Sequence, residues 1–394
     1  MNGWLMAIVI ATQTLPKQDA NELRPRVTLS GTAEFGAHAR VHVDGIAEAL
    51  VADRAKRGGR VNDFNADARD AWIEVGGKHA DVRAGYGRLA WGRLDEVQPS
   101  DVINPIDTAR FFLDGRSEAR LPVAFTRARW FASSSVTVEG VLVPFFRRSR
   151  FDSLDEATSP FNLLNDAAMP VGTVATGFRR ALPERLWSNV QGGGRVSATA
   201  GRVDVSVSAY RGYRGFGDIN FEPSPTATQQ QVSLPIPGRP IVGELVERFP
   251  RFTMFAADAE TVTGAWAWRG EAALFKDDSF DIGAGVDRKT GEYRVFGSVL
   301  MHRDFATTTA AATNVNIVGS IERKFSQDHY LARIFGVANP GDRSGFARAV
   351  FVWSASDRVA IEATAAKFMG DGDDTISRFA GRDFVMARLR YYLR

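Results

Sequence analysis

Charged side chains recur two residues apart in several segments, the spacing that places side chains on one face of an extended strand. Arg127 and Arg129 form one such pair, and Arg269 and Glu271 form another. Guanidinium and carboxylate groups that line a water-filled pore orient and select anionic or dipolar solutes. The same groups could instead pair with one another, which would stiffen a barrel and anchor a loop. The candidate lumen residues are Arg127, Arg129, Glu139, Arg269, Glu271, Arg294, Arg348, Arg388 and Arg390.

Residues 91–123 mix acidic and basic side chains and show no strand-like alternation. The Asn104-Pro105 step is a turn signal, and Phe111 and Phe112 form an apolar group among the charges. A connection of this length is usually functional or disordered, and its apolar group and prolines favour order. We predict an inserted or capping loop that either selects solutes or acts as a structural plug. Its candidate residues are Asp95, Asp101, Asn104, Asp107, Arg110, Phe111, Phe112 and Arg116.

Catalytic and metal-binding chemistry finds little support in the sequence. His38 and His42 share a strand face, but such residues are more often polar lumen groups than metal ligands. His302 could be combined with Ser30 or Ser298 as a hydrolase, although no spacing requires it. The chain has no cysteine, and it has neither a glycine-rich phosphate loop before a helix nor an HExxH motif. We therefore expect no catalytic residue, no metal and no cofactor.

Apolar or small residues alternate with polar ones along most of the chain. Residues 26–43 alternate for longer than a typical soluble strand of about 5 or 6 residues, and residues 261–275 and 383–393 repeat the pattern. A tilted strand of about 9 to 11 residues crosses a bilayer. The pattern predicts an all-β fold, a transmembrane antiparallel up-and-down β-barrel of about 16 strands, with a margin of about two.

The connections between the expected strands alternate between short and mostly longer ones. The short ones lie near residues 78, 134, 201, 259, 289, 327 and 357. Short periplasmic turns at one rim and long outward loops at the other are typical of outer-membrane barrels, and an even strand count places both termini at the short-turn rim. The expected longer set is 44–68, 92–121, 147–189, 214–250, 276–279, 305–311, 338–344 and 370–380.

The polar faces of the expected strands carry arginines and acids that have no obvious partner domain. A wet lumen and an apolar surface toward lipid account for both faces, whereas a soluble barrel or β-sandwich would bury its apolar face. The formal net charge is only +3, which is too balanced to indicate nucleic-acid binding. The expected partners are outer-membrane lipid and a small-molecule solute, with envelope proteins as further candidates.

Residues 3–11 form an apolar run with the length of a signal-peptide core. The run is far shorter than the roughly 18 to 20 apolar residues of a transmembrane helix. We expect a signal peptide at residues 1–11, a periplasmic spacer at 12–25 and one barrel domain at 26–394 that contains the 91–123 loop. The alternative is that the apolar run is a buried N-terminal strand.

A set of short motifs surrounds the 91–123 loop. They are a Gly-Arg strand end, a Trp-Gly step, an Asn-Pro-x-Asp turn and a closing Leu-Pro, at Gly87-Arg88, Trp91-Gly92, Asn104-Pro105-Ile106-Asp107 and Leu121-Pro122. Together they resemble a family of uncharacterised outer-membrane barrels of Gram-negative bacteria that is known only as a domain of unknown function. Residues 268–275 and the C-terminal segment are similar to later strands of that family. A more distant likeness extends to alginate-export and other substrate-selective porins.

Two positions depart from the family pattern. The family often has glutamine before the Trp-Gly step, where this chain has Leu89 and Ala90. The last residue is Arg394 rather than the aromatic residue of a barrel-insertion signal. The resemblance implies a barrel, whereas it says little about a substrate. Movement of hydrophobic or lipid-like compounds together with inner-membrane exporters is its less specific implication.

These observations predict an outer-membrane channel or transport component for an amphipathic or anionic solute. The alternative is a structural barrel subunit that packs against partner proteins in a larger envelope complex. A barrel hydrolase is the third hypothesis.

Overall fold

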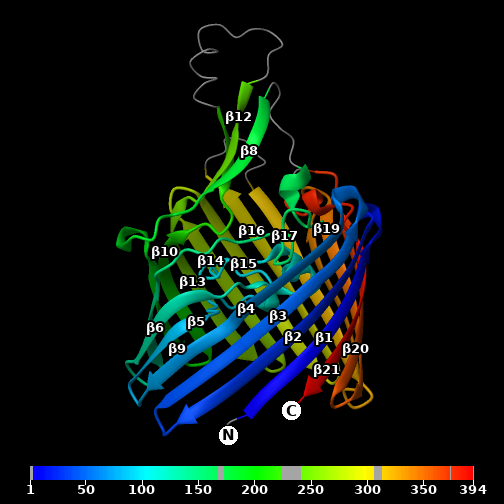
Figure 1. Ribbon diagram of the computed structural model, residues 1–394. Helices are drawn as coiled ribbons and strands as arrows, with labels where there is room; N and C mark the ends of the chain where they lie inside the picture. Colours follow the sequence, from blue (N-terminus) through cyan, green and yellow to red (C-terminus); the bar gives the residue numbers. More distant parts are fainter. Residues whose placement is uncertain (1–2, 167–172, 224–240, 306–312, 373, 394) are drawn as a thin grey trace.

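The computed structural model describes residues 3–166, 173–223, 241–305, 313–372 and 374–393. Its main feature is one closed antiparallel sheet of 18 strands (Figure 1). Each barrel strand pairs with the next one along the chain, and β1 pairs with β21 to close the barrel. The all-β barrel predicted from the alternation is therefore confirmed, and the strand number lies within the expected margin.

The barrel strands follow one another around the wall in sequence order. The first half comprises β1 (Gly3–Leu15), β2 (Ala20–Phe35), β3 (Ala39–Arg54), β4 (Gly59–Gly76), β5 (Ala80–Gly87), β6 (Val123–Phe131), β7 (Val136–Val143), β9 (Gln191–Ala200) and β10 (Val203–Tyr213). The second half comprises β13 (Arg251–Thr263), β14 (Trp266–Phe275), β15 (Ser279–Thr290), β16 (Tyr293–Asp304), β17 (Thr313–Phe325), β18 (Tyr330–Asn339), β19 (Ser344–Ser356), β20 (Val359–Met369) and β21 (Phe384–Leu393).

The two rims of the barrel differ in the way that the connection lengths predict. Short turns such as those at residues 77–79 and 357–358 lie at the rim that also carries both ends of the chain (Figure 1). The turn expected near residue 259 lies instead at residues 264–265, because β13 continues to Thr263. The connections 88–122, 144–190 and 214–250 lie at the opposite rim. We call these two ends the short-turn rim and the long-loop rim.

The periplasmic spacer expected at residues 12–25 is not what the structure has there. That segment belongs to β1 and β2, which pair along their whole length, and β1 also pairs with β21. The apolar run at residues 3–11 therefore forms an N-terminal strand, which was the alternative to a signal peptide. A signal peptide at residues 1–11 stays a prediction that competes with this strand. The alternation is hidden in β1 because Ala7 and Val9 are apolar but face inward, between outward-facing apolar residues.

Two expected boundaries between residues 26 and 68 are also wrong. The segment 26–43 is a hairpin rather than one strand, because Gly36 takes a left-handed φ of 63° and turns β2 into β3. The segment 44–68 is not a long loop, since β3 and β4 continue through it and meet at residues 55–58. Glycine adopts a left-handed φ without steric cost. The apolar–polar alternation of the sequence therefore continues through this turn and does not show where β2 ends and β3 begins.

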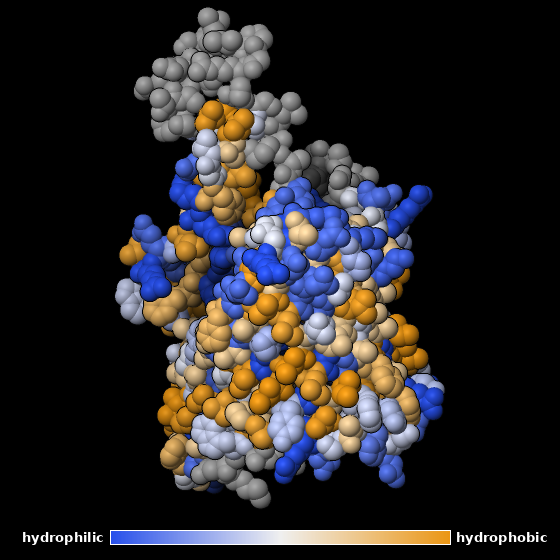
Figure 2. Space-filling view, turned by 45° about the vertical axis from the view of Figure 1, so that its right-hand side comes forward, coloured by the Kyte–Doolittle hydropathy of each residue, from blue (hydrophilic) through white to orange (hydrophobic). Residues whose placement is uncertain are grey.

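Polar side chains face the lumen and apolar ones face outward, the inverse of a soluble β-protein. Glu48, Glu271 and Arg388 on the wall are all at most 6% exposed, whereas Val207 and Ile334 are each 59% exposed. Figure 2 shows apolar side chains spread over the lower wall and hydrophilic ones gathered toward the long-loop rim. An outward apolar belt around a polar interior is the arrangement of transmembrane barrels.

Three further strands lie in the long loops. β8 (Thr173–Ala181), β11 (Asp218–Pro223) and β12 (Ile241–Arg248) form a small sheet that projects beyond the long-loop rim (Figure 1). The helical segments are short: α1 (Thr108–Leu113), α2 (Arg116–Ala119) and the 3-10 turns Pro16–Gln18, Ala55–Arg57, Leu163–Asp166, Trp187–Asn189 and Ser377–Phe379. In the described part of the chain, a helix with the length and apolarity to cross a membrane is not found.

Candidate functional site: a loop inside the barrel and two cavities

Residues 88–122 connect β5 to β6 and fold into the barrel, and we call them the inner loop (Figure 1). Asn104 ties the two ends of this loop together. Its side-chain oxygen accepts a hydrogen bond from the Leu89 N–H at 2.7 Å, and its amide donates one to the Leu121 carbonyl oxygen at 2.7 Å. The inserted loop predicted from the lack of alternation is therefore present.

Glu271 on β14 holds the first part of the inner loop by its backbone. The Glu271 carboxylate accepts hydrogen bonds from the backbone N–H groups of Arg93, Leu94 and Ser100 at 2.9, 3.2 and 2.7 Å. The Ser100 hydroxyl donates a further one at 2.7 Å. Gly92 has a φ of 93°, and a Cβ at this position would lie 2.7 Å from the carboxylate. The Trp-Gly step therefore needs glycine because a wall carboxylate occupies the space beside it.

The side chains next to this anchor bind neighbouring strands. Trp91 is 2% exposed and donates from its indole nitrogen to Glu139 on β7 at 2.8 Å. Arg93 donates to Asp258 at 2.5 Å and to Glu260 at 3.1 Å, both on β13. Buried indole N–H groups and buried charges need such partners, so these bonds fix where the loop lies against the wall.

Helix α1 is held at its beginning by charged groups. Asp107 caps the helix, because its Oδ1 accepts a hydrogen bond from the Arg110 N–H at 3.0 Å. Its other oxygen accepts one from Arg150 in the next long loop at 3.1 Å. The Arg110 guanidinium forms an ion pair with Glu48 on β3. Asp107 and Arg110 thus hold the loop in place rather than face open solvent.

Asp114 anchors the end of α1. Its carboxylate accepts from Arg26 on β2 at 3.0 Å and from Arg388 on β21 at 2.5 Å. Burial alone would raise the pKa of the Asp114 carboxyl, but the two guanidinium groups outweigh burial and hold the pKa well below its ordinary value. The anchor therefore stays ionised at any pH at which an ordinary aspartate is ionised.

Phe112 of the inner loop packs among aromatic rings of the wall and of the long loops. The Phe112 ring lies 5.0 Å from Phe346, 4.8 Å from Phe368, 4.8 Å from Phe379 and 5.9 Å from Phe161, measured between ring centroids. Two of these rings come from the wall strands β19 and β20, and the other two come from long loops. Aromatic pairs at such distances stabilise beyond their buried area, so α1 is clamped between the wall and the outer loops.

A cavity of about 630 Å³ lies between the inner loop and the wall, and we call it the inner cavity. Seven of its sixteen lining residues are arginines and four are carboxylates. The arginines are Arg93, Arg116, Arg120, Arg195, Arg269, Arg333 and Arg348, and the acids are Asp95, Glu96, Asp114 and Glu260. A polar cavity with more cations than anions attracts negative solutes.

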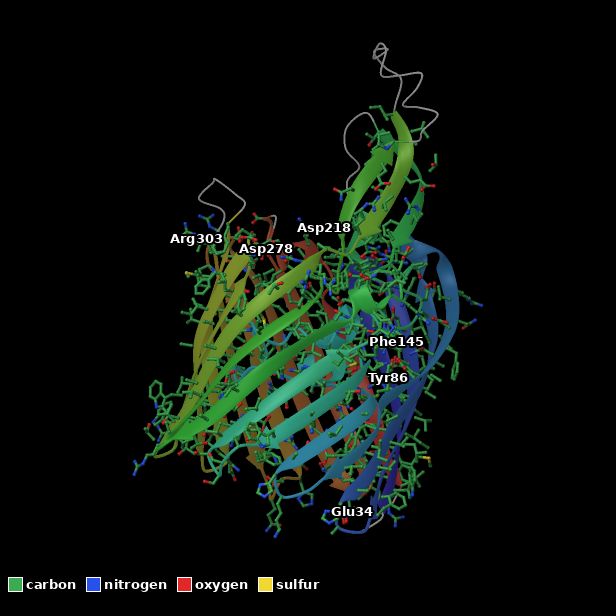
Figure 3. The ribbon with its side chains drawn as sticks, turned by 90° about the vertical axis from the view of Figure 1, so that its left-hand side faces the viewer. Glu34, Tyr86, Phe145, Asp218, Asp278 and Arg303 are labelled. Carbon is green, nitrogen blue, oxygen red and sulfur yellow. The ribbon has the colours of Figure 1, made fainter. Side chains whose placement is uncertain are left out.

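A second cavity of about 410 Å³, the outer cavity, opens among the strand ends of the long-loop rim. Its wall combines aromatic rings such as Tyr213, Phe252 and Phe275 with polar groups such as His302 and Arg214. Figure 3 shows this upper rim, with Asp278 and Arg303 labelled there and Glu34 labelled at the short-turn rim. Arg195, Glu260 and Arg269 of the inner cavity lie further down β9, β13 and β14, which also line the outer cavity.

Arg116 lines both cavities, and its ion pair with Asp101 lies between them. Asp101 accepts from Arg116 at 2.8 Å and from Arg120 at 2.7 Å. Deeper in the lumen, Asp95 pairs with Arg269, and burial raises the pKa of the Asp95 carboxyl above its ordinary value despite that cation. The inner loop therefore places a charged partition across the lumen between the two cavities.

The family model described as "Protein of unknown function (DUF1302)" matches residues 44–292, more than half of the chain and all of the inner loop. The chain belongs to this family. The resemblance inferred from the motifs around the inner loop is thus confirmed. Comparison with curated protein sequences gives no match.

Solved structures of outer-membrane porins have the same fold as this DUF1302 protein. OccAB4 of Acinetobacter baumannii aligns with a TM-score of 0.54 and 8% identity over 99% of this chain and 97% of its own. OccK7 (OpdD) of Pseudomonas aeruginosa aligns with a TM-score of 0.53 and 8% identity over 100% and 98%. OccD3 (OpdP) of the same organism gives 0.53 and 6% over 100% and 91%. At these identities the likeness concerns the fold.

The structure divides the candidate lumen residues into two groups. Arg269 and Arg348 line the inner cavity together with Asp95 and Arg116 of the inner loop. The others form hydrogen bonds or ion pairs at the wall: Arg127 with Glu74, Arg129 with Asp81, Arg294 with Asp287, Arg388 and Arg390 with Glu362, Glu139 with Trp91, and Glu271 with the loop backbone. The side chains of this second group pair with wall residues or bind the inner loop, which corresponds to the alternative role of stiffening the barrel and anchoring the loop.

Several residues that line the inner cavity are not among the candidates predicted from the sequence. Arg195 and Arg333 occupy inward positions of alternating strands, and Arg93 and Arg120 lie inside the predicted loop. The alternation could have included the first two. Nothing in a strand pattern shows at which depth an inserted loop meets the wall, so the grouping of these arginines around one cavity needed the fold.

The histidines considered for catalysis and metal binding have other partners. Both ring nitrogens of His302 contact carboxylates, Nδ1 with Asp281 at 2.7 Å and Nε2 with Asp304 at 3.1 Å. His42 bonds the Thr32 hydroxyl at 2.8 Å. His302 therefore contacts two acids, and the Ser298 hydroxyl has no hydrogen-bond partner among the described residues.

Proposed function

We propose that this protein is an outer-membrane channel for small anionic solutes and that the inner loop forms its selective constriction. The observation that carries the proposal is the inner cavity, where arginines outnumber acids at the level of a loop bound inside a closed barrel. Positive side chains that line a narrow pore favour the passage of anions.

The proposed outer-membrane location follows from the surface of the barrel. Exposed apolar side chains such as Val207 and Ile334 would be poorly accommodated in water as part of a continuous belt. A closed barrel satisfies its backbone hydrogen bonds within the sheet, which is what a strand needs in order to span lipid. The asymmetric rims and the porin-type fold of the structural neighbours support the same location.

The size of the inner cavity supports a small solute. About 630 Å³ lies within the range of typical ligand sites, roughly 300 to 1,000 Å³. The aromatic wall of the outer cavity adds a place where an apolar part of an amphipathic anion could rest before it meets the charged partition. A structural subunit of an envelope complex is the competing function, and it would have no need for conduction.

Ion selectivity in planar bilayers tests the proposal. Under a potassium chloride gradient we expect a conducting protein whose reversal potential has the sign of chloride preference. Arg116→Gln, which removes a cation shared by both cavities, should lower that preference. Arg323→Gln is the matched control, because Arg323 pairs with Glu292 at the short-turn rim and lies outside both cavities. A silent barrel would favour the structural subunit, and a cation-selective current would contradict the proposed solute class.

A further inference from the structure

Arg348 on β19 differs from the other six arginines of the inner cavity. Each of those six has an ion pair with a carboxylate, whereas Arg348 has none within the part of the chain that the structure describes. Arg348 is nevertheless only 6% exposed. Buried charges are normally paired, because an isolated ion in a low-dielectric surrounding is costly. The missing counter-charge therefore calls for an explanation.

The nearby carboxylates are engaged elsewhere. Glu96 accepts from Arg333 at 2.7 Å, and Asp114 is held between Arg26 and Arg388. These bonds also hold the inner loop in position, so neither acid can move to Arg348 without loosening the loop. The positive charge of Arg348 is left over in a cavity whose other charges are paired.

The hydrogen-bond donors of Arg348 are only partly used. Its Nη1 donates to the Phe112 carbonyl oxygen at 2.9 Å, which fixes the guanidinium against the end of α1. Its Nε is buried and has no hydrogen-bond partner among the described residues. Its Nη2 lies 3.5 Å from the place where a Cβ on Gly115 would be, and Gly115 has a φ of 103°. A side chain at position 115 would therefore begin in van der Waals contact with Nη2, and glycine leaves this space beside Nη2 unfilled.

We infer that Arg348 is a binding site for the oxyanion group of the solute. Two adjacent guanidinium donors in one plane match two oxygens of a carboxylate or phosphate group. The guanidinium groups of Arg348 and Arg333 both lie over the ring of Phe335, at 6.0 and 5.9 Å from its centroid. This contact helps to hold the Arg348 guanidinium in place. This site rests on the proposed anion channel and adds to it one residue that a solute must engage on its way through the inner cavity.

The test is anion binding to the purified full-length protein in detergent. A ligand that binds the folded state raises the denaturant midpoint with its concentration, and the dependence gives its dissociation constant. Sodium acetate and sodium phosphate are the probes, and sodium chloride at equal ionic strength is the reference. We expect saturable stabilisation by at least one probe, with acetate alone indicating a carboxylate site, phosphate alone a phosphate site, and both the shared chemistry.

Two substitutions locate the site. Arg348→Gln should weaken binding of the effective probe by about tenfold or more, the usual cost of one charged hydrogen bond. Arg348→Lys keeps the charge but loses the paired donors, so it should also bind more weakly, and it covers the case that the glutamine variant does not fold. Arg323→Gln should bind as the unchanged protein does.

The outcomes separate this site from the proposed function. If neither probe binds saturably, or if Arg348→Gln and Arg348→Lys bind as well as the unchanged protein, the Arg348 site is overturned, while anion conduction in bilayers would still stand. If the probes bind through Arg348 and the bilayers stay silent, the site holds and the channel proposal fails.

Discussion

At the scale of single residues, buried carboxylates determine where the inner loop lies. Glu271 accepts from three loop N–H groups and a hydroxyl, and Asp114 accepts from two wall arginines. Hydrogen bonds to charged groups are stronger than neutral ones, and a buried partner left unpaired costs about 1 to 3 kcal/mol. Several such bonds per carboxylate give the loop one defined position in an otherwise wet lumen.

Asp95 should make the ion selectivity of the channel depend on pH. Burial raises its pKa, so it takes up a proton at a higher pH than an ordinary aspartate with a pKa of about 3.9. Protonation removes a negative charge that faces Arg269 and Arg294. We expect chloride preference, measured by reversal potential in bilayers, to rise as the pH falls from neutral toward about 4. Asp95→Asn should show the higher preference already at neutral pH.

The control for this prediction is the loop anchor. A carboxyl with a lowered folded-state pKa stabilises above its unfolded pKa and loses that contribution only as the pH falls through the folded value. The pKa of Asp114 is lowered, so its ion pairs with Arg26 and Arg388 persist throughout this range. If lowering the pH raised the chloride preference of Asp95→Asn as much as that of the unchanged protein, the pH dependence would come from other carboxylates.

At the scale of elements, two kinds of interaction hold the inner loop at two separate parts of the wall. Hydrogen bonds and ion pairs from Glu271 and Asp258 fix its first part against β13 and β14. Aromatic packing around Phe112 fixes α1 against β19 and β20. A long connection pays a large ordering entropy, and two separated attachments offset it while leaving the charged partition between them.

Phe112→Ala should detach one of these two attachments. Truncating a buried phenylalanine costs about 3 to 5 kcal/mol, and Phe112 is 8% exposed among five other rings. We expect a lower denaturant midpoint and a larger single-channel conductance, because residues 114–117, which follow α1 directly, line the inner cavity. Phe111→Ala is the matched control, since that ring is only half-buried and contacts Phe112 alone among the described rings. Equal stability of the two variants would mean that the charged anchors suffice.

At the scale of the whole molecule, the sequence predicts the barrel better than its contents. Alternation along strands such as β21 and the unequal connections at the two rims follow from the lipid on one side and water on the other, so they are visible in the chain. The strand β1 does not show this alternation because Ala7 and Val9 are apolar and yet face inward. The match between Glu271 and the Arg93 backbone escapes for a different reason: it joins residues 178 apart in the chain, and no local pattern encodes it.

The outward face of the wall provides the test of the whole architecture. Arg333 and Ile334 are neighbours in β18, and the arginine pairs with Glu96 in the lumen while the isoleucine is 59% exposed opposite Ile321 of β17. An arginine on the lipid face near the bilayer midplane costs about 2 to 4 kcal/mol, whereas an arginine on a soluble protein's surface is usually within about 0.5 kcal/mol of neutral. We therefore expect Ile334→Arg to lower the free energy of unfolding from phospholipid vesicles by about that larger amount, and Ile334→Leu to leave it nearly unchanged. If the arginine variant were as stable in vesicles as the leucine variant, this face would not contact lipid, and the membrane barrel itself would have to be abandoned.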